Sequence, residues 1–157
     1  PKPVSAAATR KNMPSLSEVL ADPAKRKRVI DDGVAVVEAE VADKSGLSGM
    51  AIKAAFGMVQ KLKPGFVGGA LNHLMPDFAL QIDPIWADCQ KSGQEPRRYF
   101  VAHANRIADS LLHVTDDRAK NAVGPVRSTY DKLRPEASKH VQAAMPRLAD
   151  LVKKHAS

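Results

Sequence analysis

Proline divides this chain into segments in which apolar residues recur with a helical period. Of the eleven prolines, two lie within the first thirteen residues, and most of the others stand where a helix is expected to begin or end. Asp22-Pro23 and Asp83-Pro84 each have the form of a helix N-cap followed by a first-turn proline. No stretch alternates apolar and polar residues as a β-strand does. The sequence therefore predicts an all-α fold.

The spacing of apolar residues places the individual helices. The clearest one is expected at 96–118, where Phe100, Ile107 and Leu111 share one face. The other expected helices span 15–21, 23–43, 48–62, 66–75, 76–91, 122–133 and 135–155, with Pro146 interrupting the last. Within 48–62, one side of the helix carries Ile52, Ala55, Phe56, Val59 and Leu62. We predict a compact bundle of six to eight helices over 14–157, preceded by a flexible basic tail at 1–13.

Length and composition limit the class of protein. A chain of 157 residues is expected to form one domain with a core that needs neither disulfide nor metal. Cys89 is the only cysteine, which fits a reducing compartment. No apolar run approaches the roughly 18 residues that cross a membrane, and the N-terminal residues lack the apolar segment of a secretory signal. The expected location is the cytoplasm of a bacterium.

The net charge of +7 is unevenly distributed along the chain. Residues 44–76 carry four lysines and no acid, and the first fourteen residues carry three basic residues and no acid. Such a balance favours phosphate-bearing partners through an attraction that salt would screen. Ordinary solubility is the commoner explanation for a charge of this size.

The stretch DKSGLSG at 43–49 has two interpretations. Its Ser-Gly pairs would let backbone N–H groups approach a phosphate at a helix start, or they simply end one helix and let Ser48 cap the next. The second interpretation is favoured, because no strand precedes the stretch and its spacing differs from a Walker loop. The two are compatible. The candidate anion-binding residues are Arg10, Lys11, Lys44, Ser45, Ser48 and Lys53.

Evidence for catalysis or metal binding is weak. Asp109, His113 and Asp117 recur every four residues, but such a row is more often a solvated helix face than a metal site. Cys89 keeps step with apolar residues and is expected to be buried. Arg97-Arg98 with Tyr99 is the best cluster for nucleic acid. We predict no cofactor and no metal, and an enzyme using His113 or Cys89 is the least favoured hypothesis.

A stretch of small residues offers a second functional hypothesis. Glycines and alanines through 51–70 predict closely packed helices, which we weigh above a ligand groove. A groove for an apolar ligand or a partner helix would use the small residues at 65–70. The neighbouring apolar residues are Met58, Leu71, Leu74 and Met75.

Several motifs in a fixed order resemble an uncharacterised family of small bacterial helical proteins, a domain of unknown function. They are ADKSGLSG at 42–49, KPGF at 63–66, LMPDF at 74–78, DPIWAD at 83–88, VTDDRA at 114–119, YDKLRP at 130–135 and KHVQAAMPRLADLVKKH at 139–155. The resemblance covers nearly all of the chain after Met13 and implies one helical domain without an assigned activity. Independently of this resemblance, the acid-free basic stretch and the lack of catalytic motifs lead us to expect a non-catalytic binding or scaffold protein. Its expected partner is anionic, such as nucleic acid, the ribosome or an acidic protein surface.

Overall fold

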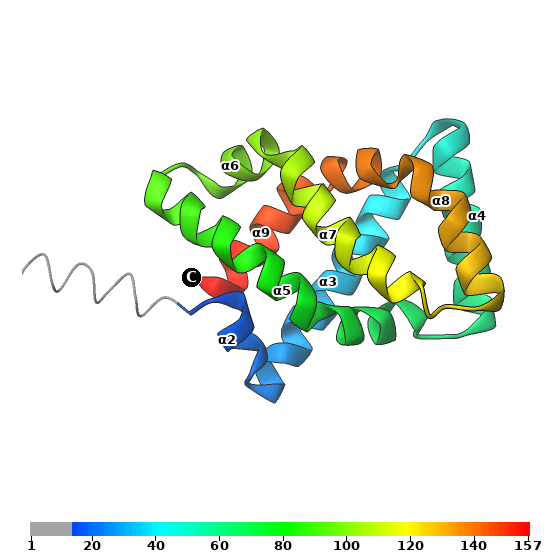
Figure 1. Ribbon diagram of the computed structural model, residues 1–157, viewed down its shortest axis with the longest axis horizontal. Helices are drawn as coiled ribbons and strands as arrows, with labels where there is room; N and C mark the ends of the chain where they lie inside the picture. Colours follow the sequence, from blue (N-terminus) through cyan, green and yellow to red (C-terminus); the bar gives the residue numbers. More distant parts are fainter. Residues whose placement is uncertain (1–13) are drawn as a thin grey trace, which may run out of the picture.

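The structure is a computed structural model and describes residues 14–157. These residues form eight helices and no strand, numbered as in Figure 1. The helices are α2 (Leu16–Leu20), α3 (Pro23–Asp43), α4 (Gly46–Leu62), α5 (Phe66–Ser92), α6 (Pro96–Ala102), α7 (Ala104–Ala119), α8 (Gly124–Ala143) and α9 (Met145–Ala156). The predicted all-α fold of six to eight helices is confirmed. The expected flexible tail at 1–13 lies outside the described residues.

The hydrophobic core occupies one end of the molecule, where α2, α6 and α9 meet the second half of α5 (Figure 1). Phe100 and Met145 are fully buried there. The ring of Trp86 packs edge-on against Phe100, with centroids 6.4 Å apart, and its Nε1 donates a hydrogen bond to the carbonyl of Ala156. Burying side chains of this size stabilises a fold by roughly 1.5–3 kcal/mol each, so this end carries most of the stability.

Of the two Asp-Pro pairs expected to cap helices, Asp22 is confirmed and Asp83 has another role. The Ser15 and Asp22 side chains accept hydrogen bonds from backbone N–H groups in the first turns of α2 and α3. Asp83 lies inside α5 instead of starting a helix. Its carboxylate accepts hydrogen bonds from the backbone N–H of Leu16 at 2.8 Å and the hydroxyl of Ser17 at 2.5 Å. Asp83 therefore satisfies the start of a different helix, α2, and ties it to α5.

The prediction of two helices at 66–75 and 76–91 is wrong, because α5 continues through Pro76 and Pro84. A proline inside a helix leaves the carbonyl four residues earlier without its usual partner. For Pro76 that carbonyl belongs to Asn72, and it accepts a 2.6 Å hydrogen bond from Nη2 of Arg26 on α3. A hydrogen bond from α3 to α5 thus replaces the backbone hydrogen bond that α5 lacks at Pro76.

Two other predicted boundaries are also corrected. The expected helix at 96–118 is divided at His103 into α6 and α7. The two parts pack on different neighbours, α6 mainly on α9 and α7 mainly on α8, which a single straight helix would not reach. A boundary between two helices was expected near Pro135, but Pro135 lies within α8. The boundary between α8 and α9 falls at Ala144, and Pro146 stands in the first turn of α9.

The other end of the molecule is built differently. There α4 and α8 lie side by side, with α3, α5 and α7 extending toward them from the core (Figure 1). Gly49 is the only buried residue of α4, and α8 has none. The inward faces of these helices therefore surround a space instead of interlocking. No helix of the described part is long and apolar enough to cross a membrane.

Candidate ligand cavity

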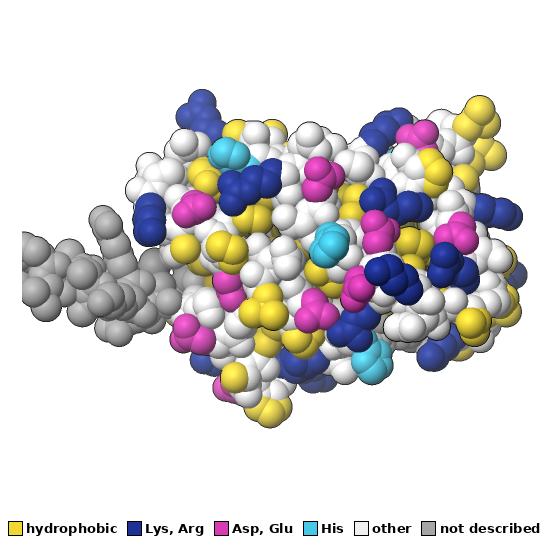
Figure 2. Space-filling view, viewed as in Figure 1, with side chains coloured by type: hydrophobic (Ala, Val, Ile, Leu, Met, Phe, Trp, Pro, Cys, Tyr) yellow, Lys and Arg dark blue, Asp and Glu magenta, His cyan; other side chains and the backbone are white. Residues whose placement is uncertain are grey.

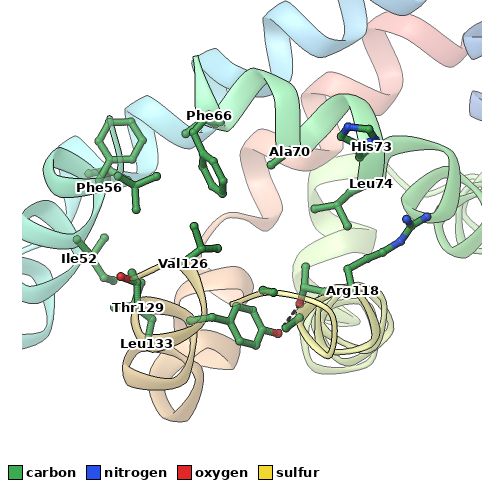
Figure 3. A pocket seen from close by; sticks show the side chains of 18 residues that line it. Ile52, Phe56, Phe66, Ala70, His73, Leu74, Arg118, Val126, Thr129 and Leu133 are labelled. Carbon is green, nitrogen blue, oxygen red and sulfur yellow. Dashed lines mark hydrogen bonds between the residues drawn. The ribbon is translucent and has the colours of Figure 1, made fainter. Parts of the chain in front are cut away.

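A cavity of about 470 Å³ lies between α4 and α8, with walls completed by α3, α5 and α7 (Figure 3). We call it the α4–α8 cavity. Its lining is almost wholly apolar. The lining residues are Val41, Ile52, Ala55, Phe56, Val59, Phe66, Val67, Ala70, His73, Leu74, Thr115, Arg118, Ala119, Ala122, Val126, Thr129, Tyr130 and Leu133. The volume falls within the roughly 300–1,000 Å³ that is usual for small-molecule pockets.

Helical periodicity explains how each wall is formed. The predicted apolar side of α4 faces the cavity, except for Leu62, which is exposed. On α5, Phe66, Ala70 and Leu74 follow one another along the wall, with Ala70 in the middle (Figure 3). The contribution of α8 was not anticipated, although Val126, Thr129, Tyr130 and Leu133 have the spacing of one helical face.

Two hydroxyl groups of the wall, those of Thr115 and Tyr130, are hydrogen-bonded to neighbouring groups. The hydroxyls of Thr115 and Tyr130 are 2.8 Å apart in a hydrogen bond, and the Tyr130 hydroxyl also donates to Asp116. Arg134 holds both oxygens of Asp116, at 2.7 and 2.9 Å. This guanidinium lowers the pKa of Asp116, while burial, and then the bond to Asp116, raise the pKa of Tyr130. Thr115 and Tyr130 therefore present mainly their carbon atoms to the cavity.

Among residues 14–157, the charged residue that lines the cavity is Arg118, which lies at its margin. Arg118 of α7 donates a 2.7 Å hydrogen bond to Asp77 of α5, and both side chains are about half exposed. His73 lies beside Leu74 on the same side as Arg118 (Figure 3). A ligand with an apolar body could therefore keep a polar group at this margin.

Glycines do not close this space, and the prediction of close helix packing through 51–70 is wrong for them. A methyl group added at Gly57, Gly65 or Gly69 would meet no atom within 4 Å, and one at Gly68 would make only an ordinary contact. The close approach occurs on α3, where a methyl at Gly33 would lie 3.2 Å from Leu71. Of the four apolar residues predicted to border the groove, only Leu74 lines the cavity. Leu71 and Met75 lie on the side of α5 that faces Gly33, and Met58 is exposed.

Residues 16–156 match the model of a family of unknown function, DUF6918. The chain belongs to this family. The resemblance inferred from the ordered motifs is thus confirmed over nearly all of the chain after Met13. No curated protein and no solved structure matches the sequence significantly.

In this DUF6918 protein, the turn at 44–49 joins α3 to α4. Gly46 has the expected positive φ of 72°, but it is the first residue of α4 and does not end α3, whose C-cap is Lys44. Ser45 and not Ser48 occupies the N-cap position of α4, and its side chain makes no capping bond. A methyl group at Gly49 would lie 2.6 Å from the carbonyl carbon of Lys44. The turn therefore requires glycine at both positions for structural reasons.

The candidate anion-binding residues are not brought to one point. The Lys44 ammonium pairs with Glu40 at 3.1 Å, and both side chains are largely buried. Ser48 makes a 2.7 Å hydrogen bond with Nε2 of His140, joining α4 to α8. Lys53 is exposed on the outer side of α4. Arg10 and Lys11 lie outside the described residues, so their role stays a prediction.

Arg147 of α9 also holds the end of α3. Its guanidinium pairs with Glu40 and with Asp43, the latter at 2.7 Å. These hydrogen bonds raise the pKa of Arg147. The carboxylates next to Lys44 are thus already neutralised by cations of the protein itself.

Several of the remaining candidates have structural roles. Asp117 pairs with Lys120, and the described residues contain no group of three His, Cys, Asp or Glu side chains arranged to hold a metal. Cys89 is buried in the core, and burial raises the pKa of its thiol. Tyr99 is buried, while Arg97 makes two hydrogen bonds to Asp150.

Proposed function

We propose that this protein is a non-catalytic binding protein whose α4–α8 cavity holds one small apolar molecule, with the character of a hydrocarbon chain. The observation that carries the proposal is the pairing of an almost wholly apolar lining with a volume of ligand size. Ligand pockets are typically apolar clefts with a few polar groups that orient the ligand. Arg118 and His73, at the margin, are the groups suited to that purpose.

The packing of the two ends of the molecule supports the proposal. The core end needs no additional atoms, because its large side chains are fully buried. At the other end α4 and α8 contribute no buried apolar side chain, and their inward residues border the cavity. An apolar ligand would bury these residues and stabilise that end, since burial contributes roughly 25 cal/mol per Å² of apolar surface.

The bonding of the wall also argues for an apolar ligand. Water in a cavity needs two to four polar partners. Here Thr115 and Tyr130 already bond to each other, and Tyr130 also bonds to Asp116. A ligand rich in polar groups would find few free partners, so the chemistry favours a hydrocarbon over a sugar or a nucleotide.

The experiment is a fluorescence titration of delipidated protein with cis-parinaric acid, an 18-carbon polyene acid. At about −0.3 kcal/mol per heavy atom, binding would contribute about −6 kcal/mol, which corresponds to a Kd of tens of micromolar or tighter. We expect saturation at one molecule per chain. The Ala70→Phe variant places a ring in the middle of the α5 wall and should weaken binding at least about tenfold, because part of the cavity is filled.

The matched control is Ala87→Phe, on the same helix but exposed and away from the cavity. It should bind as the unaltered protein does. Absence of saturable binding, or equal weakening in both variants, would contradict the proposal. Binding of an apolar helical peptide in place of the fatty acid would instead favour a groove for a partner helix.

Engagement of an anionic partner is a second candidate. The supporting observation is that Lys53, Lys61 and Lys63 are exposed, and that the chain has no acidic residue from 44 to 76. Retention on immobilised heparin that falls with salt would support it. Because Lys44 is paired and largely buried, Lys53→Ala should reduce retention more than Lys44→Ala. Equal retention of both variants and the unaltered protein would remove these residues from the candidate.

We also propose that the protein acts in the bacterial cytoplasm. The supporting observation is that Cys89, the only cysteine, is a free and buried thiol, as suits a reducing compartment. Fractionation of the native cells, followed by immunodetection, tests the location. Recovery from the cytosolic fraction and the inner face of the membrane fits the proposal, and recovery from the medium would contradict it.

A further inference from the structure

We propose that the outer face of α4 docks on the surface of an anionic lipid bilayer. This surface consists of Leu47, Met50, Ala51, Lys53, Ala54, Met58, Lys61 and Leu62. The inference rests on the second candidate function and names its anionic partner as a membrane. It does not depend on the identity of a ligand in the α4–α8 cavity.

The outer face of α4 carries large apolar side chains although it points away from the protein. Leu47, Met50, Met58 and Leu62 are between 44% and 87% exposed. The opposite side of the same helix, including Phe56 and Val59, borders the cavity. A helix that is apolar on every side is normally buried, so the outer face of α4 is suited to a partner that removes it from water.

Charge complementarity selects an anionic partner. The charged residues of the outer face are Lys53 and Lys61, and Lys63 follows at the helix end. Within residues 14–157, no carboxylate forms an ion pair with any of these three lysines. Figure 2 shows yellow, dark blue and some magenta side chains at the margin that α4 and α8 occupy in Figure 1, and α4 itself contains no acidic residue.

Exposed apolar side chains together with lysines and no acidic residue are typical of a helix that binds at a membrane interface. Such a helix lies in the plane of the membrane, with its apolar residues among the acyl chains and its lysines near anionic headgroups. A nucleic acid would use the lysines but leave Leu47 and Met50 in water. A bilayer satisfies both features, and for this reason we infer a membrane.

The position of α4 gives this contact a consequence. The helix separates the outer face from the α4–α8 cavity, and it contributes only Gly49 to the buried residues of the protein. Its connections at the two ends contain Gly46 and Gly65, both with positive φ. Docking would therefore place the cavity one helix away from the lipid phase, where an apolar molecule could be exchanged.

The test is flotation of the full-length protein with vesicles of phosphatidylcholine alone or mixed with phosphatidylglycerol. We expect binding to the mixed vesicles at low salt and little to the neutral ones. Lys53→Glu with Lys61→Glu should weaken binding by on the order of 25-fold or more, from roughly fivefold per lysine near an anionic surface. The control, Lys25→Glu with Lys91→Glu, changes the net charge equally at exposed lysines on α3 and α5, and it should bind much more strongly.

A second pair of variants tests the apolar part. Leu47→Gln with Met50→Gln should weaken binding, whereas Leu80→Gln with Val101→Gln, at exposed positions on α5 and α6, should not. A Leu47→Trp variant should show a blue-shifted emission with the mixed vesicles, because its indole enters the acyl region. Trp86, the only natural tryptophan, is buried and provides a constant background.

Three results would overturn the inference. The first is failure to bind the mixed vesicles while heparin retention persists, which would leave the anionic-partner candidate standing without a membrane. The second is failure to bind either, which would remove both. The third is vesicle binding that the α4 variants and the controls share equally. Where vesicle binding fails, a dimer in sedimentation velocity that Leu47→Gln dissociates would make this surface a contact between two copies.

Discussion

Replacing Ala70 with leucine should stabilise the protein, although it places a larger side chain inside the fold. The substitution adds three carbon atoms that point into the α4–α8 cavity (Figure 3). At about 0.8 kcal/mol for each buried CH₂, the gain would reach about 2.4 kcal/mol. Fixing a leucine side chain costs about 0.5–1 kcal/mol. We therefore expect the free energy of unfolding to rise by about 1.5 kcal/mol, which corresponds to a Tm increase of roughly 3–6 °C.

The same substitution at two other alanines provides the comparison. Ala149 is fully buried in the core, and overpacking there should destabilise the protein by roughly 1–3 kcal/mol. Ala87 is exposed on α5, and leucine there should change stability by less than about 0.5 kcal/mol. The expected order of stability is Ala70→Leu, then the unaltered protein and Ala87→Leu, then Ala149→Leu.

Urea unfolding of delipidated protein, followed by far-UV circular dichroism and by Trp86 fluorescence, measures these differences. Delipidation is necessary because a bound ligand would itself stabilise the native state. Trp86 is the only tryptophan and lies in the core, so its emission reports global unfolding. If Ala70→Leu destabilised the protein as much as Ala149→Leu, the region beside Ala70 would be tightly packed and the reasoning from the cavity would be refuted.

Three further changes test the electrostatics and the turn. Gly49→Ala should destabilise the protein by about 1–3 kcal/mol because its methyl group would collide with backbone, whereas Gly57→Ala, in open space within the same helix, should stabilise it by about 0.5–1 kcal/mol in thermal unfolding. Burial lowers the pKa of His140 from its ordinary value near 6.5. The stability that the neutral ring contributes is therefore present above that pH and is lost as the pH falls below it. Amide hydrogen exchange in α4, corrected for intrinsic rates, should accelerate at pH 5, and it should accelerate less in His140→Gln. Arg134 lowers the pKa of Asp116, so Arg134→Met should cost about 1 kcal/mol at pH 7, and the difference should vanish as the pH falls well below about 3.9.

Local signals in the sequence were sufficient where each helix depends on its own residues. Ser15 and Asp22 cap the helices that follow them, and the apolar side of 48–62 is the side that faces the cavity. Patterns of this kind act over one or two turns and need no knowledge of the partner.

The predictions failed where a distant partner decides the outcome. Pro76 leaves the carbonyl of Asn72 without a helical partner, and Arg26, 46 residues before Asn72, donates a hydrogen bond to it. The helix that was expected to end before Pro76 therefore continues. Asp83 resembles the N-cap of its own segment but caps α2. No local pattern contains either contact, because each is created by the packing of α5 against its neighbours.

Only part of the candidate site could be predicted from the sequence, for the same reason. The hypothesis of an apolar groove identified the α5 wall around Ala70 and Leu74, but the α8 wall was missed, although Val126, Thr129, Tyr130 and Leu133 form a regular stripe. A stripe indicates which side of a helix is covered and does not distinguish a packed core from a cavity. Only the distances between helices make that distinction.

The central claim is most directly tested by native mass spectrometry of the protein isolated from its own cells. If the α4–α8 cavity holds an apolar molecule, the unaltered protein and Ala87→Phe should each carry one noncovalent adduct per chain, and Ala70→Phe should have lost it. The adduct mass would then identify the ligand. Protein without any adduct, or an adduct retained equally by Ala70→Phe, would contradict the claim that this cavity is the binding site.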